Sequence, residues 1–273
     1  MKPDRDAPIG VFDSGVGGLT VAREIMRNLP SEKIVYFGDT ARVPYGGKSR
    51  ENIIRYSRQI IHFLMEQKVK AIVIACNTAS AFALEEVRDE FDIPILGVIE
   101  PGARIAAGET KNKRVGVIGT VGTVDSGIHA SCLKKLDPEI TVISKACPLF
   151  VPLVEEGWLH DPVTAEVIAR YLQEFKDKNV DTLILGCTHY PLIRSAIREF
   201  MGDEVRLVNP AYETALDLGN LLKEKSLGST GKGQEEFPYR FYVSDLAEKF
   251  KAFAGSILPY DVEMTQKIDI EKY

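Results

Sequence analysis

The sequence predicts an α/β fold in which helices alternate with the strands of largely parallel sheets. Two cysteines, Cys76 and Cys187, each follow a run of aliphatic residues and precede polar residues and a helical pattern. A buried parallel strand that ends at the start of a helix has this composition. A glycine-rich motif at residues 9–17 also returns at residues 115–123. Because open α/β folds keep their chemistry at the carboxyl ends of the strands, we expect both cysteines to lie at such ends.

The first hundred residues alternate between strand and helix patterns. Short runs of apolar residues, many of them β-branched or aromatic, indicate buried strands, and longer runs with apolar residues three and four apart indicate amphipathic helices. This alternation is typical of a largely parallel sheet. The predicted strands cover residues 8–13, 34–37, 70–75 and 94–98, and the predicted helices cover residues 19–29, 50–67 and 79–91.

The same patterns continue through the rest of the chain. Residues 147–156 are mostly apolar and end in carboxylates, so we expect a loop or a short helix there. Residues 226–236 are polar and contain glycine, which is typical of a surface loop, whereas the tail after Pro259 gives no prediction. The predicted strands cover residues 114–119, 140–144, 183–186, 205–208 and 240–243, and the predicted helices cover residues 162–177, 192–201, 210–225 and 246–253.

Two features of the chain repeat at nearly the same distance. Ile9 and Val115 head the two copies of the glycine-rich motif, 106 residues apart, and the two cysteine motifs are 111 residues apart. Two independent features that return at one offset indicate an internal duplication of one α/β unit. A chain of 273 residues is also long enough for two lobes.

Composition excludes several kinds of partner. The chain is 45% hydrophobic and 27% charged, as in ordinary globular proteins, and its net charge is −5. A nucleic-acid or anionic-membrane surface would call for clustered basic residues, so neither partner is expected. We see no leader-like segment and no apolar run of about 20 residues. These features predict a cytoplasmic protein with small-molecule partners.

The glycine-rich turns do not predict a nucleotide site. Residues 13–18 lack the G-x-G-x-x-G spacing, and Asp13 heads the turn where a phosphate would need a donor. Residues 46–49 imitate the end of a P-loop, but Arg42 stands where the first glycine of that motif would fall. We expect a tight turn there, followed by a helix capped by Ser49.

The four cysteines predict reduced thiols and no metal site. They form no C-x-x-C pair, and their few histidine neighbours have no zinc-ligand spacing. For Cys132 and Cys147 the favoured interpretation is a small buried hydrophobic residue. Cys76 and Cys187 are predicted at helix N-termini, where backbone N–H groups and the helix dipole lower a thiol pKa from about 8.5 towards neutrality.

Polar side chains follow both of these cysteines and suit an anionic ligand. Asn77 and Thr78 follow the first, and Thr188 and His189 follow the second, so each thiol has donors for a carboxylate beside it. If the two halves face each other, both thiols reach one cleft. A pair of bases on opposite sides of a carbon can invert its configuration, one removing the proton and the other returning it. A single-nucleophile hydrolase would instead need one cysteine supported by a histidine and a third group, so we interpret His189 as an auxiliary.

Six motifs in order carry a resemblance to a known family. The chain resembles the glutamate racemases, a cofactor-independent branch of the aspartate/glutamate racemase superfamily, over essentially its whole length. This resemblance implies two pseudo-symmetric α/β domains with the active site at their interface, the second domain being inserted into the first. Domain one would comprise residues 1–98 plus 208–273, and domain two residues 99–207. The motifs are residues 12–18, 38–42, 44–46, 75–79, 119–123 and 186–191.

The resemblance also implies roles for individual residues. Cys76 and Cys187 match the two family bases, with Asp13 assisting the first, His189 assisting the second, and Glu155 a further catalytic candidate. The carboxylates and amino group of the substrate would be held by hydroxyl, amide and backbone groups, while Asp13 pairs with the ammonium. No cofactor and no metal is implied. The matching substrate-binding positions are Asp13, Ser14, Pro44, Tyr45, Gly46, Cys76, Asn77, Thr78, Thr120, Cys187, Thr188 and His189.

Several alternatives stay open at this point. The leading hypothesis is interconversion of L- and D-glutamate, which would supply D-glutamate for peptidoglycan. An aspartate racemase with the same cysteine pair is the nearest rival, and a decarboxylase relative would keep only one of the two cysteines. A non-catalytic binding or inhibitor protein is the alternative from another class. Racemases of this kind are often dimers, so a homodimer is one expectation, although Trp158, Phe150 and Tyr273, taken as exposed, fit a monomer equally well.

Overall fold

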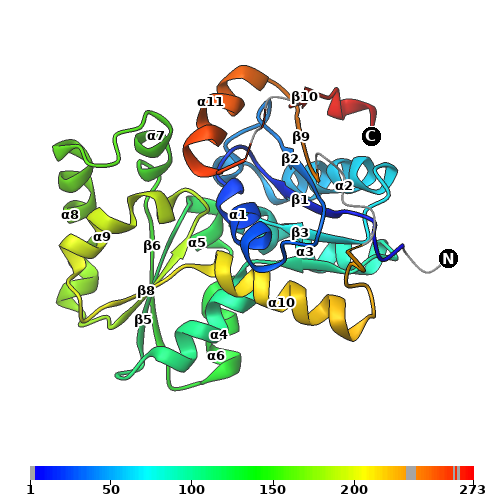
Figure 1. Cartoon of the computed structure of the whole chain (residues 1–273). Coiled ribbons are helices and arrows are strands. Elements are labelled where there is room, and N and C mark those ends of the chain that lie inside the picture. Colours follow the sequence, from blue (N-terminus) through cyan, green and yellow to red (C-terminus); the bar gives the residue numbers. More distant parts are fainter. Residues whose placement is uncertain (1–3, 232–237, 261, 263–264) are drawn as a thin grey trace.

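A computed structural model describes residues 4–231, 238–260, 262 and 265–273. Residues 232–236 of the predicted surface loop lie outside this range. The described chain forms two separate sheets flanked by helices (Figure 1). All strand pairs are parallel, with the order β10-β9-β2-β1-β3-β4 in sheet A and β6-β5-β7-β8 in sheet B. The predicted α/β class with largely parallel sheets is confirmed.

Sheet A is covered by helices on both faces, which is why its inner strands are almost entirely apolar. Along β1, Ile9 and Val11 pack under α1, α10 and α11, whereas Phe12 packs with residues of α2 and α3. Alternate residues of a strand point to opposite faces, so one apolar run serves two cores. The strands are β1 (Ile9–Asp13), β2 (Ile34–Gly38), β3 (Ala71–Ile74), β4 (Ile95–Gly97), β9 (Tyr239–Val243) and β10 (Gln266–Lys267), and the helices are α1 (Leu19–Asn28), α2 (Arg50–Glu66), α3 (Asn77–Glu90), α10 (Pro210–Glu224) and α11 (Ala247–Ile257).

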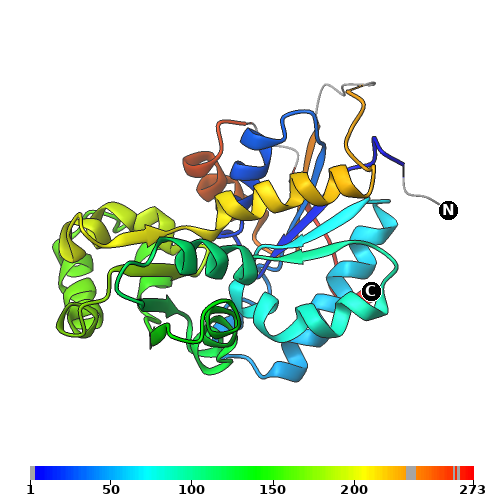
Figure 2. The ribbon, with the colours of Figure 1, turned by 90° about the horizontal axis from the view of Figure 1, so that it is seen from below.

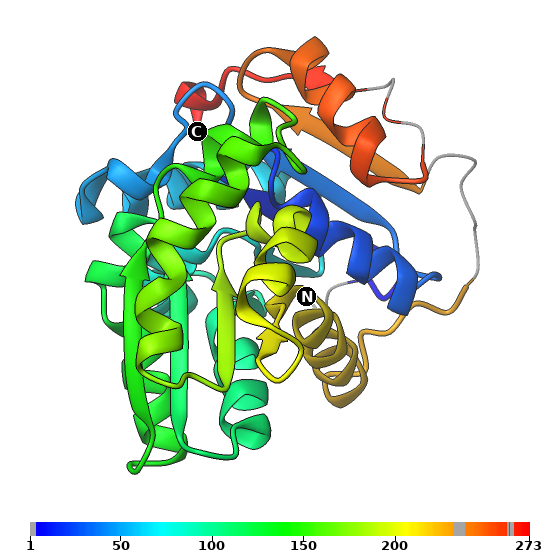
Figure 3. The same ribbon diagram turned by 90° about the vertical axis from the view of Figure 1, so that its left-hand side faces the viewer.

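Sheet B has the same layered construction. Helices α7, α8 and α9 contribute to the core on one face, and α4 and α6 contribute to the core on the other (Figures 1 and 3). Helix α10 packs on both α1 and α4 and so connects the two halves (Figure 2). The strands are β5 (Arg114–Gly119), β6 (Thr141–Ala146), β7 (Thr182–Gly186) and β8 (Arg206–Val208), and the helices are α4 (Ile99–Glu109), α5 (Val121–Asp125), α6 (Ile128–Leu136), α7 (Phe150–Glu155), α8 (Pro162–Asp177) and α9 (Arg194–Met201).

The two sheets repeat one topology, as the duplicated motifs predict. The order β2-β1-β3-β4 in sheet A corresponds to β6-β5-β7-β8 in sheet B. The register also corresponds, because Ile9 pairs with Ala71 in sheet A and Val115 pairs with Thr182 in sheet B. The equivalent strands β3 and β7 therefore deliver their cysteines to equivalent positions.

The elements that follow the two cysteines differ from the prediction. Helix α3 begins at Asn77, two residues earlier than expected, because Cys76 itself is the N-cap and its sulfur accepts from the N–H of Ala79. After Cys187, a 3₁₀ turn (Tyr190–Ile193) precedes α9 instead of one helix from residue 192. Only one of the two thiols therefore caps a helix.

Other differences arise where local patterns are weak. Helices α4 and α6 were not anticipated, and α4 contains both proline and glycine, which obscure a helical pattern. Phe150 is fully buried, which corrects its interpretation as exposed, because it packs edge-on against Tyr190 in the core of sheet B. Trp158 is exposed, and Tyr273 is partly buried against Phe63. Within the described ranges, no helix has both the length and the apolar character that a bilayer crossing requires.

Candidate active site

The carboxyl ends of the strands bring both cysteines to one cavity between the two sheets. Cys76 follows β3 and Cys187 follows β7, and both are more than nine-tenths buried. The cavity measures about 30 Å³. The lining residues are Ser14, Val43, Pro44, Tyr45, Gly46, Cys76, Asn77, Thr78, Thr120, Val151, Gly186, Cys187, Thr188 and His189.

The cavity wall contains all the candidate residues except two. Asp13 and Glu155 do not line it, but each lies one contact behind a residue that does. Val43, Val151 and Gly186 also line the cavity, although they are not among the predicted site residues. Pro44 and Cys187 are sequence neighbours of two of them, but only the packing of the two halves shows which adjacent residues face inward.

Two glycines allow the halves to approach each other closely at this cavity. A Cβ atom at Gly17 would lie 2.4 Å from Thr188 Oγ1 and 2.5 Å from His189 Nδ1. A Cβ atom at Gly46 would lie 2.5 Å from the Cβ of Thr120. Contacts this short do not occur between real atoms, so the turn after β1 and the loop after β2 meet sheet B only because these positions are glycine.

Burial dominates the surroundings of Cys76. Its sulfur lies 3.7 Å from Ser14 Oγ and accepts from the backbone N–H of Ala79 at 3.5 Å. Burial and the nearby carboxylate of Asp13 raise the pKa of the Cys76 thiol to about 12. The predicted lowering of its pKa by the helix N-terminus is therefore wrong, because the Ala79 and Ser14 contacts are outweighed by desolvation and by a like charge.

Asp13 is a fully buried carboxylate shared between the two halves. It accepts from the N–H of Gly15 at 3.0 Å and from the hydroxyl of Thr188 at 3.5 Å. Burial raises its pKa, while the charge of His189 and the backbone N–H groups of residues 14, 15 and 18 oppose this rise. Asp13 thus connects the end of β1 with the residues that follow β7.

A chain of three groups supports the second cysteine. His189 Nδ1 lies 3.8 Å from Cys187 Sγ, and His189 Nε2 lies 3.1 Å from Glu155 Oε1. Burial by itself lowers the pKa of His189, but the hydrogen bonds to Cys187 and Glu155 and the charges of Cys187 and Asp13 raise it to about 10. An imidazolium therefore lies beside Cys187 at neutral pH and attracts negative charge on that sulfur.

Hydroxyl and amide groups fill the opposite side of the cavity. Thr78 Oγ1 lies 2.9 Å from Thr120 Oγ1 and 3.0 Å from Thr123 Oγ1. Asn77 is also buried, and its Oδ1 has no hydrogen-bond partner among the described residues. Hydroxyl donors suit a carboxylate, and an unpaired amide oxygen suits an ammonium, so this wall fits both ends of an amino acid.

No group of three or more His, Cys, Asp or Glu residues suited to a metal ion occurs in the described part of the chain. All four cysteines carry free thiols, with Cys147 buried and Cys132 partly exposed. The interpretation of Cys132 as a buried residue is thus wrong, because it lies on α6 at the edge of a core cluster.

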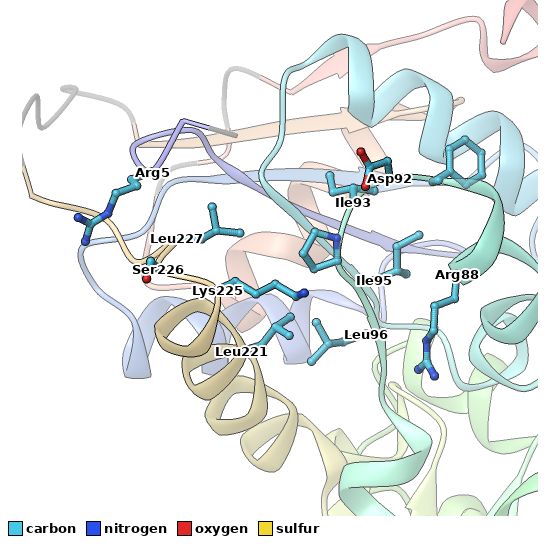
Figure 4. Close-up of a pocket in the computed structure, with 12 residues that line it drawn as sticks. Arg5, Arg88, Asp92, Ile93, Ile95, Leu96, Leu221, Lys225, Ser226 and Leu227 are labelled. Carbon is cyan, nitrogen blue, oxygen red and sulfur yellow. The ribbon is translucent and has the colours of Figure 1, made fainter. Parts of the chain in front are cut away.

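A wider hollow of about 890 Å³ lies elsewhere on sheet A (Figure 4). Its walls include Arg5, Arg88, Ile95, Leu221 and Leu227. Ile95 begins β4, so this hollow is at the amino end of a strand, and it contains no cysteine and no candidate residue. The smaller cavity between the cysteines is therefore the candidate site, because it contains the reactive side chains that the larger hollow lacks.

Comparison with known proteins identifies the family of this chain. A model of the Asp/Glu/Hydantoin racemase family matches residues 9–215. The chain belongs to this family. It is 50% identical over 242 residues to a glutamate racemase of Geobacter metallireducens, with 89% of each chain covered.

Solved structures of family members share the whole fold. Glutamate racemase isoform RacE1 from Bacillus anthracis superposes with a TM-score of 0.92 at 39% identity, covering 97% of this chain and 98% of that one. The glutamate racemase of Francisella tularensis in complex with D-glutamate superposes with a TM-score of 0.91 at 40% identity, covering 98% of this chain and 100% of that one. The similarity thus includes the residues beyond 215 that the family model leaves out.

Proposed function

We propose that this protein is a glutamate racemase that interconverts L- and D-glutamate by proton transfer between two thiols, without a cofactor. The observation that carries the proposal is that two cysteines from equivalent strands line one cavity in a chain of this family. The relatives and structures described above are glutamate racemases, so the aspartate alternative and a non-catalytic role are not favoured. The product D-glutamate would serve peptidoglycan synthesis.

In the proposed mechanism, one cysteine removes the α-proton as a thiolate and the other returns a proton as a thiol. Cys76 is protonated at neutral pH because its pKa is raised to about 12, so it begins as the acid. Cys187 is proposed to begin as the base, with the His189 imidazolium 3.8 Å from its sulfur. For the other enantiomer the roles reverse, and each thiol then needs the opposite protonation state.

The remaining candidates hold the substrate and stabilise charge. Thr78, Thr120 and backbone groups of residues 45–46 are proposed to bind the carboxylates, and Asn77 and Asp13 to attract the ammonium. A bound ammonium near Asp13 would offset the negative charge that disfavours a thiolate at Cys76. Fixed donors in a water-poor cavity can stabilise the carbanion-like transition state.

Three further points belong to the proposal. The proposed domain boundaries are residues 98/99 and 207/208, which separate the two sheets except for Val208, the last residue of β8 in sheet B. A homodimer is one candidate assembly. The reaction is placed in the cytoplasm, because thiols that act as acid and base must stay reduced.

The decisive experiment follows optical activity. Circular dichroism of D- or L-glutamate mixed with the purified protein should decay to zero without any added cofactor. A stable signal from glutamate, together with decay of the signal from aspartate, would replace the glutamate assignment by the aspartate alternative. Stable circular dichroism signals from both glutamate and aspartate would favour the non-catalytic alternative.

A further inference from the structure

A buried carboxylate, Asp39, lies just outside the cavity and has no role in the mechanism above. Asp39 follows β2, and its side chain has no exposed surface. Its backbone N–H donates to the carbonyl of Asp13 at 3.0 Å, which joins the ends of β2 and β1. Its carboxylate accepts hydrogen bonds from three side chains: Tyr45, Arg42 and Ser244.

The first of these bonds reaches the cavity wall. The hydroxyl of Tyr45 donates to Asp39 Oδ2, and the ring of Tyr45 lines the cavity together with Gly46. Burial and the charge of Asp39 raise the pKa of Tyr45 well above its usual value, so the phenol keeps the proton that it donates. Gly46 packs against Thr120 of the other half, so a shift of this loop would change the cavity directly.

The other bonds fix Asp39 from the C-terminal part of the chain. Ser244, which follows β9, donates to Asp39 Oδ1 at 2.8 Å and accepts from the N–H of Ala41 at 2.8 Å. Arg42 Nε donates to Asp39 Oδ2 at 2.7 Å, and its Nη1 lies 3.1 Å from Glu271 Oε1 in the C-terminal 3₁₀ turn (Ile270–Lys272). A carboxylate with these partners is fixed in place as well as compensated for its burial.

We propose that Asp39 is a positioning residue for the active site. It holds the wall formed by residues 44–46 through the Tyr45 hydroxyl, and it is itself anchored by Ser244 and by the Arg42–Glu271 contact. The C-terminal turn thereby sets the position of a loop that touches both the cavity and the opposite half. The effect on glutamate affinity rests on the proposed function, whereas the effect on access to Cys76 does not.

The test combines Asp39→Asn, Tyr45→Phe, the double variant and Glu271→Gln. For Tyr45→Phe we expect KM for glutamate to rise about tenfold, with kcat changed less than about threefold, since misplacement of a wall weakens binding. Asp39→Asn should raise KM at least as much, and the double variant no more than Asp39→Asn alone. Glu271→Gln should raise KM about twofold. The matched control is Asp269→Asn, which removes an exposed contact with Lys272 in the same tail and should leave KM unchanged.

A second measurement does not depend on turnover. Iodoacetamide should alkylate Cys76 about tenfold faster in Tyr45→Phe and Asp39→Asn, as read from the modified peptide by mass spectrometry, because the loosened wall opens access to it. Alkylation of Cys147, buried in the other half, should not change, whereas general destabilisation would accelerate both. If Asp39→Asn does not fold, the Tyr45→Phe and Glu271→Gln variants test the positioning role without it.

The results that would overturn the positioning role of Asp39 differ from the result that would refute the proposed function. Multiplicative effects of the two substitutions on KM, or a folded Tyr45→Phe with wild-type KM and wild-type Cys76 alkylation, would overturn the positioning role. A wild-type protein that does not racemise glutamate would refute the proposed function alone, and the alkylation comparison would still decide the role of Asp39.

Discussion

The two cysteine sites share one construction and have opposite electrostatic surroundings. Strands β3 and β7 occupy the same place in the strand order that the two sheets share, and each ends within two residues of its cysteine. Cys76 lies near the carboxylate of Asp13, whereas Cys187 lies beside the His189 imidazolium, which Glu155 supports. Duplication of a fold unit therefore explains where the thiols are, and the residues packed around each thiol decide which charges lie beside it.

This asymmetry has a consequence for a reversible reaction. A racemase must remove a proton from either enantiomer, so in the proposed mechanism each thiol acts as acid in one direction and as base in the other. The free site favours a thiol at Cys76, whereas an imidazolium lies beside Cys187, so the two sides are not equivalent. The ammonium of the substrate, by offsetting the charge of Asp13, is the group that would make the other direction accessible.

The largest effect is expected from removing either thiol. Cys76→Ala and Cys187→Ala should each lower racemisation about 10⁴-fold, because each removes one of two obligatory proton-transfer groups. The measurement is the decay of circular dichroism with L- and D-glutamate. Cys147→Ala, which removes a buried thiol outside the cavity, is the control and should stay within about threefold of wild type. Near wild-type turnover in either of the first two variants would exclude the two-base mechanism.

A smaller but one-sided effect is expected at Asp13. Asp13→Asn should slow proton removal at Cys76 about 10²-fold while affecting Cys187 less, because Asp13 influences the first thiol most directly. Equilibrium requires equal losses of kcat/KM in both directions. Solvent-deuterium incorporation into each enantiomer is therefore the better measurement. Equal slowing of deuterium incorporation into both enantiomers would show that Asp13 does not distinguish the thiols. The control is Asp125→Asn, which changes an exposed carboxylate on α5.

Removing the charged partner of His189 should lower kcat/KM about tenfold. In Glu155→Gln the imidazolium loses a charged partner, so the pKa of His189 falls below its value of about 10. The protonated form is then lost at lower pH, and the alkaline limb of kcat/KM should move to lower pH. The pH profile checks this shift against Glu156→Gln, an exposed neighbour. An unmoved alkaline limb would mean that Glu155 does not act through His189.

The smallest effect concerns stability on the Cys187 side. His129 packs close to Gly186, both of its ring nitrogens lack hydrogen-bond partners among the described residues, and burial lowers its pKa to about 4. In the unfolded chain the His129 imidazole binds a proton near pH 6.5, whereas in the folded protein it does so only near pH 4. The free energy of unfolding therefore decreases as the pH falls from 6.5 towards 4. His129→Phe keeps a ring without unpaired polar atoms and should gain about 1 kcal/mol in the free energy of unfolding at neutral pH.

Urea titrations at pH 7 and pH 5 measure this difference. The gain of His129→Phe should be larger at pH 5, whereas His160→Phe, an exposed control, should change little. A gain that does not depend on pH would assign the effect to packing alone.

Local patterns in the sequence determined much of this fold. Parallel strands covered on both faces need continuous apolar runs, so β1, β3, β5 and β7 were predictable from composition, and with them the place of both cysteines at strand ends. Helix α8 matched its predicted bounds, because an N-cap, a proline at the first position and an amphipathic run mark it locally. Helices α4 and α6 and strand β10 carried no comparable signal.

Tertiary structure alone decided the charge around each thiol. Asp13 lies 63 positions before Cys76, and Glu155 lies 34 positions before His189, so no local pattern links these pairs. The helix N-terminus at Cys76 was readable from the sequence and would lower its pKa, yet burial and Asp13 reverse the direction. Desolvation depends on how completely the two halves enclose the cavity. The sequence thus determined which residues lie at the strand ends, and packing decided which charges surround them and how deeply they are buried.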